Sequence, residues 1–100
     1  MNLESEFTPI IDWAKERKLL LLATKESQFI KLQEEIGELA VGLIKKNKDE
    51  IKDAIGDCVV VLTILAELNN TPIEQCINEA YNEIKNRKGK TINGTFIKEQ

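Results

Sequence analysis

Apolar positions recur along this chain at spacings of three and four residues, the period of helices that bury one side. The pattern predicts four helices, over about residues 8–18, 26–46, 49–68 and 72–88. In the second helix the apolar stripe consists of Phe29, Leu32, Ile36, Leu39, Ala40 and Leu43. Because the connections are short and no linker interrupts them, we expect an all-α chain, a four-helix bundle in a single domain over residues 1–100.

Capping residues indicate where these helices begin. Thr8-Pro9 combines a capping hydroxyl with a proline at the first helical position, and Thr71-Pro72 repeats that signal. Thr24 is the candidate cap of the second helix, and it follows an apolar link at 19–22.

The last dozen residues carry turn signals. Gly89 is expected to stop the fourth helix, because glycine readily adopts the left-handed conformation that ends helices. Asn93-Gly94 lies between Ile92 and Phe96, and Asn-Gly strongly favours a two-residue hairpin turn. We therefore expect a short C-terminal hairpin or an extended tail.

The composition removes several classes of mechanism. The 100 residues include no histidine, so a Ser-His-Asp triad, a Cys-His pair and an imidazole base are excluded. Cys58 and Cys76 alone do not provide the four ligands of a structural zinc site. If the chain is an enzyme, its catalytic groups are carboxylates or lysines, and any metal that it binds is expected to be a hard cation that prefers oxygen ligands. The net charge of −3 argues against nucleic-acid binding.

Compartment and membrane contact are inferred from short segments. The acidic start, Met1 to Glu6, lacks the basic and apolar regions of a signal peptide. The longest apolar run, Cys58 to Ala66, is far shorter than the ~20 residues that span a bilayer. Both cysteines have apolar neighbours, which is typical of free thiols in a reducing compartment. We expect a cytoplasmic protein without membrane contact.

The second predicted helix carries Glu34, Glu35 and Glu38. Glu34 and Glu38 are expected to point away from the apolar stripe, whereas Glu35 borders it. Like charges at these spacings repel by roughly a few tenths of a kcal/mol. Lys31 precedes Glu34 and Glu35 by three and four residues, so it is placed to offset part of that repulsion.

The third predicted helix carries Glu50, Asp53 and Asp57 on one face, within about 60° of one another. From Cys58 to Ala66 this helix is apolar almost all round, which marks a buried segment. Asp57 therefore lies where an acidic face becomes core. A carboxylate in that position must be paired, protonated or bound to a metal.

Two interpretations of these carboxylates stay open. Antiparallel helices joined by a short turn would place the two acidic clusters side by side, as in a site for Mg²⁺ or alternatively Mn²⁺. The candidate metal ligands are Glu34, Glu35, Glu38, Asp53 and Asp57. In the other interpretation the carboxylates form a solvated face neutralised by Lys31, Lys45, Lys46, Lys48 and Lys52.

A basic cluster marks the end of the fourth predicted helix, formed by Lys85, Arg87, Lys88 and Lys90. Such cations complement the helix dipole, and beside a metal site they would instead hold phosphate oxygens. Trp13 is a candidate for stacking on a base, although a lone tryptophan equally fits a core position. Asn82 is a candidate for reading a base edge or for a surface hydrogen bond.

The ordered motifs resemble those of the MazG-like, all-α nucleoside triphosphate pyrophosphohydrolases. The segment 34–38 matches that family's Glu-Glu-x-x-Glu motif, and 55–62 is similar to its second acidic motif and the apolar helix that follows. The segment 80–87 is similar to its last-helix pattern. The ending, through Asn93-Gly94, is similar to small MazG-like proteins of phages and their bacterial hosts, so the resemblance covers nearly the whole chain.

The resemblance implies a Mg²⁺-dependent enzyme that cleaves a nucleoside triphosphate between its α and β phosphates, giving the monophosphate and pyrophosphate. It implies metal ligation by Glu35, Glu38 and Asp57, with Glu34 or Glu35 as the catalytic base. Lys85 and Arg87 would contact the phosphates. A homodimer or homotetramer is also implied, with sites built across the interface.

One position departs from the family's pattern. The acidic residue that usually lies three before the aspartate of the second motif is Ala54 here, and Asp53 or Glu50 is the candidate substitute. Two alternative functions therefore stay open. One is a non-catalytic helical oligomer that binds nucleotide or a protein partner, and the other is a related pyrophosphohydrolase that acts on a phosphoribosyl nucleotide.

Overall fold

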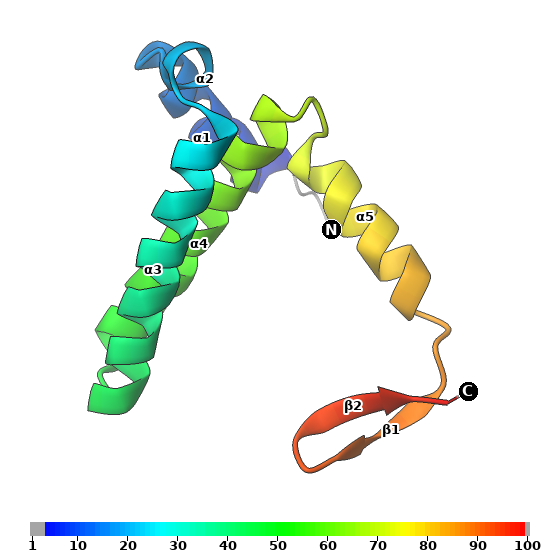
Figure 1. Ribbon diagram of the computed structural model, residues 1–100. Helices are drawn as coiled ribbons and strands as arrows, with labels where there is room; N and C mark the ends of the chain where they lie inside the picture. The colour runs from blue at the N-terminus through cyan, green and yellow to red at the C-terminus, as the bar shows by residue number, and fades with distance from the viewer. Residues whose placement is uncertain (1–3, 100) are drawn as a thin grey trace.

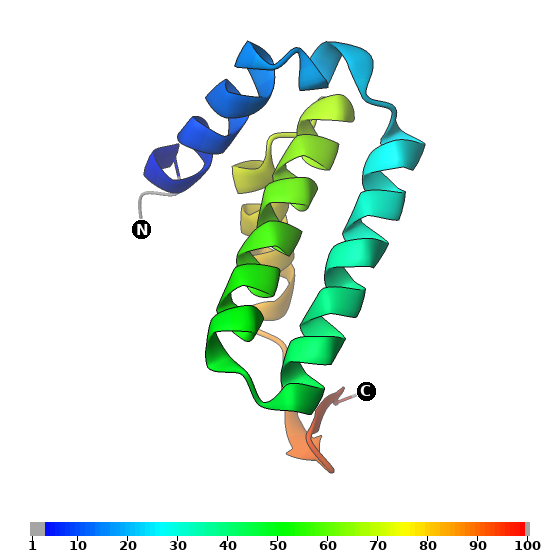
Figure 2. The ribbon, with the colours of Figure 1, turned by 90° about the vertical axis from the view of Figure 1, so that its left-hand side faces the viewer.

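The computed structural model describes residues 4–99 and confirms an all-α chain with a C-terminal hairpin. In chain order the elements are α1 (Glu4–Glu16), α2 (Leu19–Leu22), α3 (Lys25–Lys45), α4 (Lys48–Leu68), α5 (Ile73–Ile84), β1 (Gly89–Ile92) and β2 (Thr95–Lys98). Helices α3 and α4 run side by side as a long antiparallel pair, with α1 against α4 (Figure 1, Figure 2). Within residues 4–99, no helix is long and apolar enough to cross a membrane. The first three residues of the acidic start lie outside the described range.

The turn between α3 and α4 fixes how the two helices face each other. Lys46 ends α3 with a φ of 56°, and the Asn47 side chain accepts a hydrogen bond from the backbone N–H of Glu50 at 3.2 Å. Gly42 is buried where the helices approach, and a Cβ there would lie 3.3 Å from Ile51. At the other end Thr24 caps α3 as predicted, accepting a hydrogen bond from the Ser27 N–H at 3.0 Å.

The predicted start of the first helix at Thr8-Pro9 is wrong. Helix α1 begins at Glu4 and contains Pro9. Phe7 is buried, so contacts of the first turns with the rest of the chain stabilise helix ahead of the proline. The segment 19–22, expected to be a link, forms the short helix α2 after Lys18 adopts a left-handed conformation.

Two expectations about the fourth helix are also corrected. Its N-cap is Pro72 with no side-chain cap, and the Thr71 hydroxyl instead lies 3.5 Å from Cys76 Sγ. Helix α5 ends at Ile84 and not near Lys88, because the chain tightens into a turn in which the Arg87 N–H donates to the Ile84 carbonyl. The basic cluster therefore lies at and beyond the helix end.

The buried face of α3 is displaced from the predicted apolar stripe. Its buried residues are Gln28, Glu35 and Gly42, at seven-residue intervals. Half or nearly half of each predicted stripe residue Phe29, Ile36 and Leu43 is exposed. On α4 the buried residues are Ala54, Val61, Thr63, Ile64 and Ala66. The helix pair thus encloses a carboxylate, while Phe29, Ile36 and Leu43 are largely exposed and Leu32 and Leu39 are half-buried.

Helix α5 and the hairpin lead away from the α3–α4 pair (Figure 1). Helix α5 contacts α4 and α1 and buries none of its residues. The hairpin forms at the predicted turn, where Asn93 and Gly94 have φ values of 51° and 79° and Ile92 faces Thr95. Among the described elements, β1 and β2 contact only each other.

Candidate metal centre

Three carboxylates converge between the two long helices. Glu35 and Glu38 of α3 and Asp57 of α4 each offer one oxygen, and these oxygens lie within 4.8 Å of one another. Glu35 is buried, Asp57 is half-buried and Glu38 is exposed. Oxygen atoms from several carboxylates at one point, open to solvent on one side, are the ligand set of a hard divalent cation.

Glu35 is the buried member of this group, with only 6% of the residue exposed, which is unusual for a charged side chain. Lys31 Nζ lies 3.4 Å from its Oε1, as the sequence spacing predicts. Its Oε2 is buried without a hydrogen-bond partner among the described residues. A buried charged oxygen without a partner is costly, so a bound cation would satisfy an atom that the protein leaves unpaired. The residues present therefore fit a metal ion.

The electrostatics of the group are those of crowded anions. The pKa of Asp57 is raised above its ordinary value, first by burial, then by the negative charges of Asp53 and Glu35, and then by a hydrogen bond with the Glu35 side chain. Lys31 acts in the opposite direction. The pKa of Lys31 is raised by hydrogen bonds to Glu34 and Glu35. Lys31 thus pairs with two glutamates, whereas Asp57 forms no ion pair with a lysine or arginine among residues 4–99.

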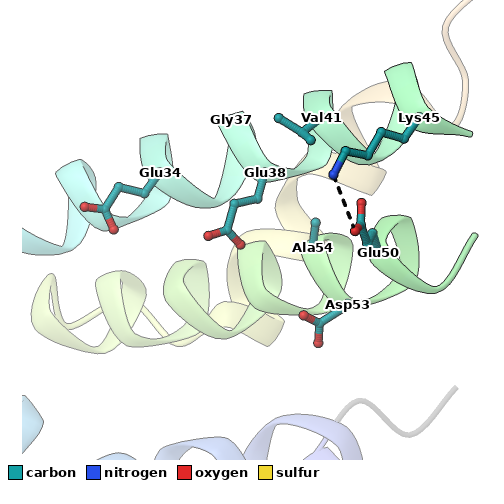
Figure 3. Close-up of a pocket in the computed structure, with 8 residues that line it drawn as sticks. All are labelled: Glu34, Gly37, Glu38, Val41, Lys45, Glu50, Asp53 and Ala54. Atoms are coloured by element: carbon teal, nitrogen blue, oxygen red, sulfur yellow. Dashed lines mark ion pairs between the residues drawn. The ribbon is translucent and has the colours of Figure 1, made fainter. Parts of the chain in front are cut away.

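A cavity of about 500 Å³ lies beside the three carboxylates along the α3–α4 pair (Figure 3). It is lined by Glu34, Gly37, Glu38, Val41, Lys45, Glu50, Asp53 and Ala54. Hereafter we call it the α3–α4 cavity. Its size suits a small ligand, and four of its eight lining residues are carboxylates.

The remaining predicted ligands lie around the cluster and not in it. Glu34 is exposed and pairs with Lys31 at 3.3 Å. Glu50 pairs with Lys45 at 3.9 Å. Asp53 lines the cavity, but in Figure 3 its carboxylate turns to the side of α4 away from α3, whereas Ala54 faces α3. Ala54 is 2% exposed, so the position where the family carries an acidic residue is filled by a buried methyl group.

Trp13 lies beside the cluster. It lines a hollow of about 420 Å³ together with Asp57, Val60, Pro9 and Ile10. Trp13 is 44% exposed, so it does not lie in the core of its own chain. The guanidinium of Arg17 lies 4.6 Å from the ring centroid. Sequence reasoning missed Arg17, although its spacing of four residues from Trp13 on one helix was a readable signal.

The structure does not bring the basic candidates to the carboxylates within one chain. Asn82 lies late on α5, and Lys85, Arg87 and Lys88 follow at and beyond its end, on the arm that leads away from α3 and α4 (Figure 1). Arg87 pairs locally with Glu83 at 3.4 Å. The cavities that the metal-cluster carboxylates line include none of these four residues within the described chain.

Comparison with known proteins places the chain in a family. The profile of the MazG nucleotide pyrophosphohydrolase domain matches residues 23–92, so the chain belongs to this family. An uncharacterized 18.2 kDa protein from the rep-hol intergenic region of Haemophilus phage HP1 (strain HP1c1) is 48% identical over 69 residues. That match covers 69% of this chain and 42% of the phage protein, so the chain spans less than half of that relative. No solved structure matches.

Proposed function

We propose that this chain is a Mg²⁺-dependent pyrophosphohydrolase that cleaves a nucleoside triphosphate, ribo or deoxy, between its α and β phosphates. The observation that carries the proposal is the convergence of Glu35, Glu38 and Asp57 with one buried oxygen unpaired. Family membership supplies the reaction class. Residues 1–100 would act as one catalytic domain.

In this proposal Glu35, Glu38 and Asp57 hold the metal, with Glu34 and Asp53 at the border of the site. When bound, Mg²⁺ would neutralise phosphate charge and lower the pKa of a water molecule. Glu34 is better placed than Glu35 to accept the proton of the attacking water, because it is exposed and is outside the converging trio. The water oxygen bonds to the α phosphorus, and the bond to the bridging oxygen of pyrophosphate breaks.

The base of the nucleotide would stack on Trp13, which is exposed beside Asp57. Asn82, Lys85, Arg87 and Lys88 would contact base and phosphates only from another copy, since their own arm leads away. A homodimer or homotetramer is therefore part of the proposal. The large exposed apolar residues of α3, among them Phe29 and Leu43, support self-association.

The experiment is a pyrophosphate-release assay with the purified protein, Mg²⁺ and a panel of standard and modified nucleoside triphosphates. Equimolar monophosphate and pyrophosphate, lost on adding chelator, is the expected result. A second panel of phosphoribosyl nucleotides tests the related pyrophosphohydrolase activity.

One observation favours a second candidate function. Ala54 places a buried methyl group where the family carries an acidic residue, so a ligand is missing from the α3-facing side of α4. A nucleotide-binding oligomer without catalysis would show Mg²⁺ and nucleotide binding by calorimetry and no turnover on either panel.

A further inference from the structure

The C-terminal hairpin has no surface to pack on within its own chain. Among the described elements, β1 and β2 contact only each other, and every residue of both strands is exposed. A two-stranded hairpin alone is at best marginally stable in water. Its formation is best explained if another surface covers it.

One face of the hairpin is free and the other is partly filled. The register places Lys90 opposite Ile97, and Ile92 lies on the same face because side chains alternate along a strand. The other face holds Phe96, whose ring lies across Gly89: a Cβ there would be 2.6 Å from it. The free face thus presents Lys90, Ile92 and Ile97, which line a hollow of about 420 Å³ together with Gly89, Lys98 and Glu99.

Charge identifies the surface that this face fits. Residues 85–99 carry five cations, Lys85, Arg87, Lys88, Lys90 and Lys98, and one anion, Glu99, so this segment has a net positive charge. The α3–α4 cavity carries four carboxylates and one lysine, and the exposed Val41 provides an apolar patch in its wall. Two hairpins would repel each other through their like charges, whereas hairpin and cavity attract.

We propose that the hairpin of one copy of this chain docks on the α3–α4 cavity of a second copy. Ile97 contacts Val41, and Lys90 enters the acidic wall near Glu50, whose own ion pair is long at 3.9 Å. The docked lysine borders the metal centre. The proposed docking is argued only from the exposed hairpin and the charges of the cavity, and does not require hydrolytic activity. A phosphate-binding role for Lys90 would rest on the proposed function.

Disulfide trapping between copies tests the contact directly. In a background of Cys58→Ala and Cys76→Ala, chains with Val41→Cys and differently tagged chains with Ile97→Cys are mixed under mild oxidant. The expected product is a disulfide between the two kinds of chain, with each variant alone remaining uncrosslinked. A dimer of Ile97→Cys chains alone would show hairpin–hairpin pairing and overturn the proposal, as would the absence of any product.

A charge swap provides a test that keeps both native cysteines. Lys90→Glu and Glu50→Lys alone are each expected to raise the dissociation constant of self-association by about tenfold at low salt, measured by sedimentation. The double variant is expected to recover most of the loss, and the matched control Glu79→Lys, exposed on α5, is expected to change little. A monomeric wild type, or a double variant as weak as the sum of its parts, contradicts the docking. No substrate or Mg²⁺ is present, so the outcome is independent of hydrolysis.

Discussion

Neutralising Asp57 should stabilise the metal-free protein. Three carboxylate oxygens within 4.8 Å give Asp57 two like-charged neighbours, Glu35 and Glu38. At 4.8 Å two unit charges repel by about 0.9 kcal/mol in water and about 3.5 kcal/mol at an effective dielectric constant of about 20. Because Glu38 is exposed and Lys31 offsets part of the charge of Glu35, the lower end applies. We expect Asp57→Asn to raise the free energy of unfolding by about 1–2 kcal/mol.

The amide offers a second gain in the same direction. Asparagine has nearly the shape of aspartate, and its N–H₂ group can donate to the unpaired Oε2 of Glu35. For a chain of this length about 1 kcal/mol shifts the melting temperature by roughly 4–8 °C. In chelator, the variant should therefore melt about 5–10 °C above wild type.

Thermal denaturation with and without Mg²⁺, at one fixed protein concentration, is the assay. Wild type should gain stability on adding Mg²⁺, because a ligand that binds only the folded state stabilises it. Asp57→Asn should lose that gain, while Glu67→Gln on the same helix but outside the cluster should keep it. A variant that melts below wild type in chelator and still responds to Mg²⁺ would show that Asp57 is a structural residue and refute this reasoning.

Three further predictions concern Ala54, the raised pKa of Asp57 and the cap of α3. Ala54→Glu should lower the stability of the protein in chelator, because it adds a buried carboxylate on the side of α4 that faces α3. The same variant should bind Mg²⁺ several-fold more tightly by calorimetry, and weaker binding would mean that position 54 does not face the ion. The pKa of Asp57 in the folded protein lies above the unfolded value of 3.8, so the folded, metal-free protein binds the Asp57 proton more tightly than the unfolded chain does. The contribution of Asp57 to stability is therefore greatest at low pH and is lost as the pH rises through the raised pKa. Mg²⁺ affinity should change in the opposite sense, falling as the solution is acidified toward the raised pKa of Asp57. An affinity that does not fall on acidification would contradict the assignment. Thr24→Ala should destabilise the protein by about 1 kcal/mol in denaturant titrations without changing Mg²⁺ binding, because it removes only the cap of α3.

The fold class and the hairpin were predictable because their signals are local. Thr24 caps α3 through atoms three residues apart, and Asn93-Gly94 supplies the two positive φ values that its turn requires. The start of α1 was not predictable in this way. The burial of Phe7 is a tertiary contact, and it outweighs the tendency of Pro9 to mark a first helical position.

The acidic cluster was only partly readable from the sequence. Periodicity correctly places Asp57 at the edge of the core, but Glu35, expected to border the buried stripe, lies within the buried face of α3. Which side of α3 is buried depends on how α4 lies against it, and the close approach at Gly42 turns Glu35 inward and Ile36 outward. Lys85 and Arg87 are separated from the carboxylates because α5 leads away from α3 and α4. A helical wheel shows the faces of one helix and does not predict the direction of that helix in the fold.

The central claim is hydrolysis at the α phosphorus, and the position of an oxygen label tests it most directly. The protein is incubated with Mg²⁺, a nucleoside triphosphate that it turns over, and water enriched in oxygen-18, and the products are weighed by mass spectrometry. The account predicts one labelled oxygen in the nucleoside monophosphate and none in pyrophosphate, with no product formed by Asp57→Asn. A label in pyrophosphate, or release of labelled inorganic phosphate with the diphosphate as the other product, would contradict it.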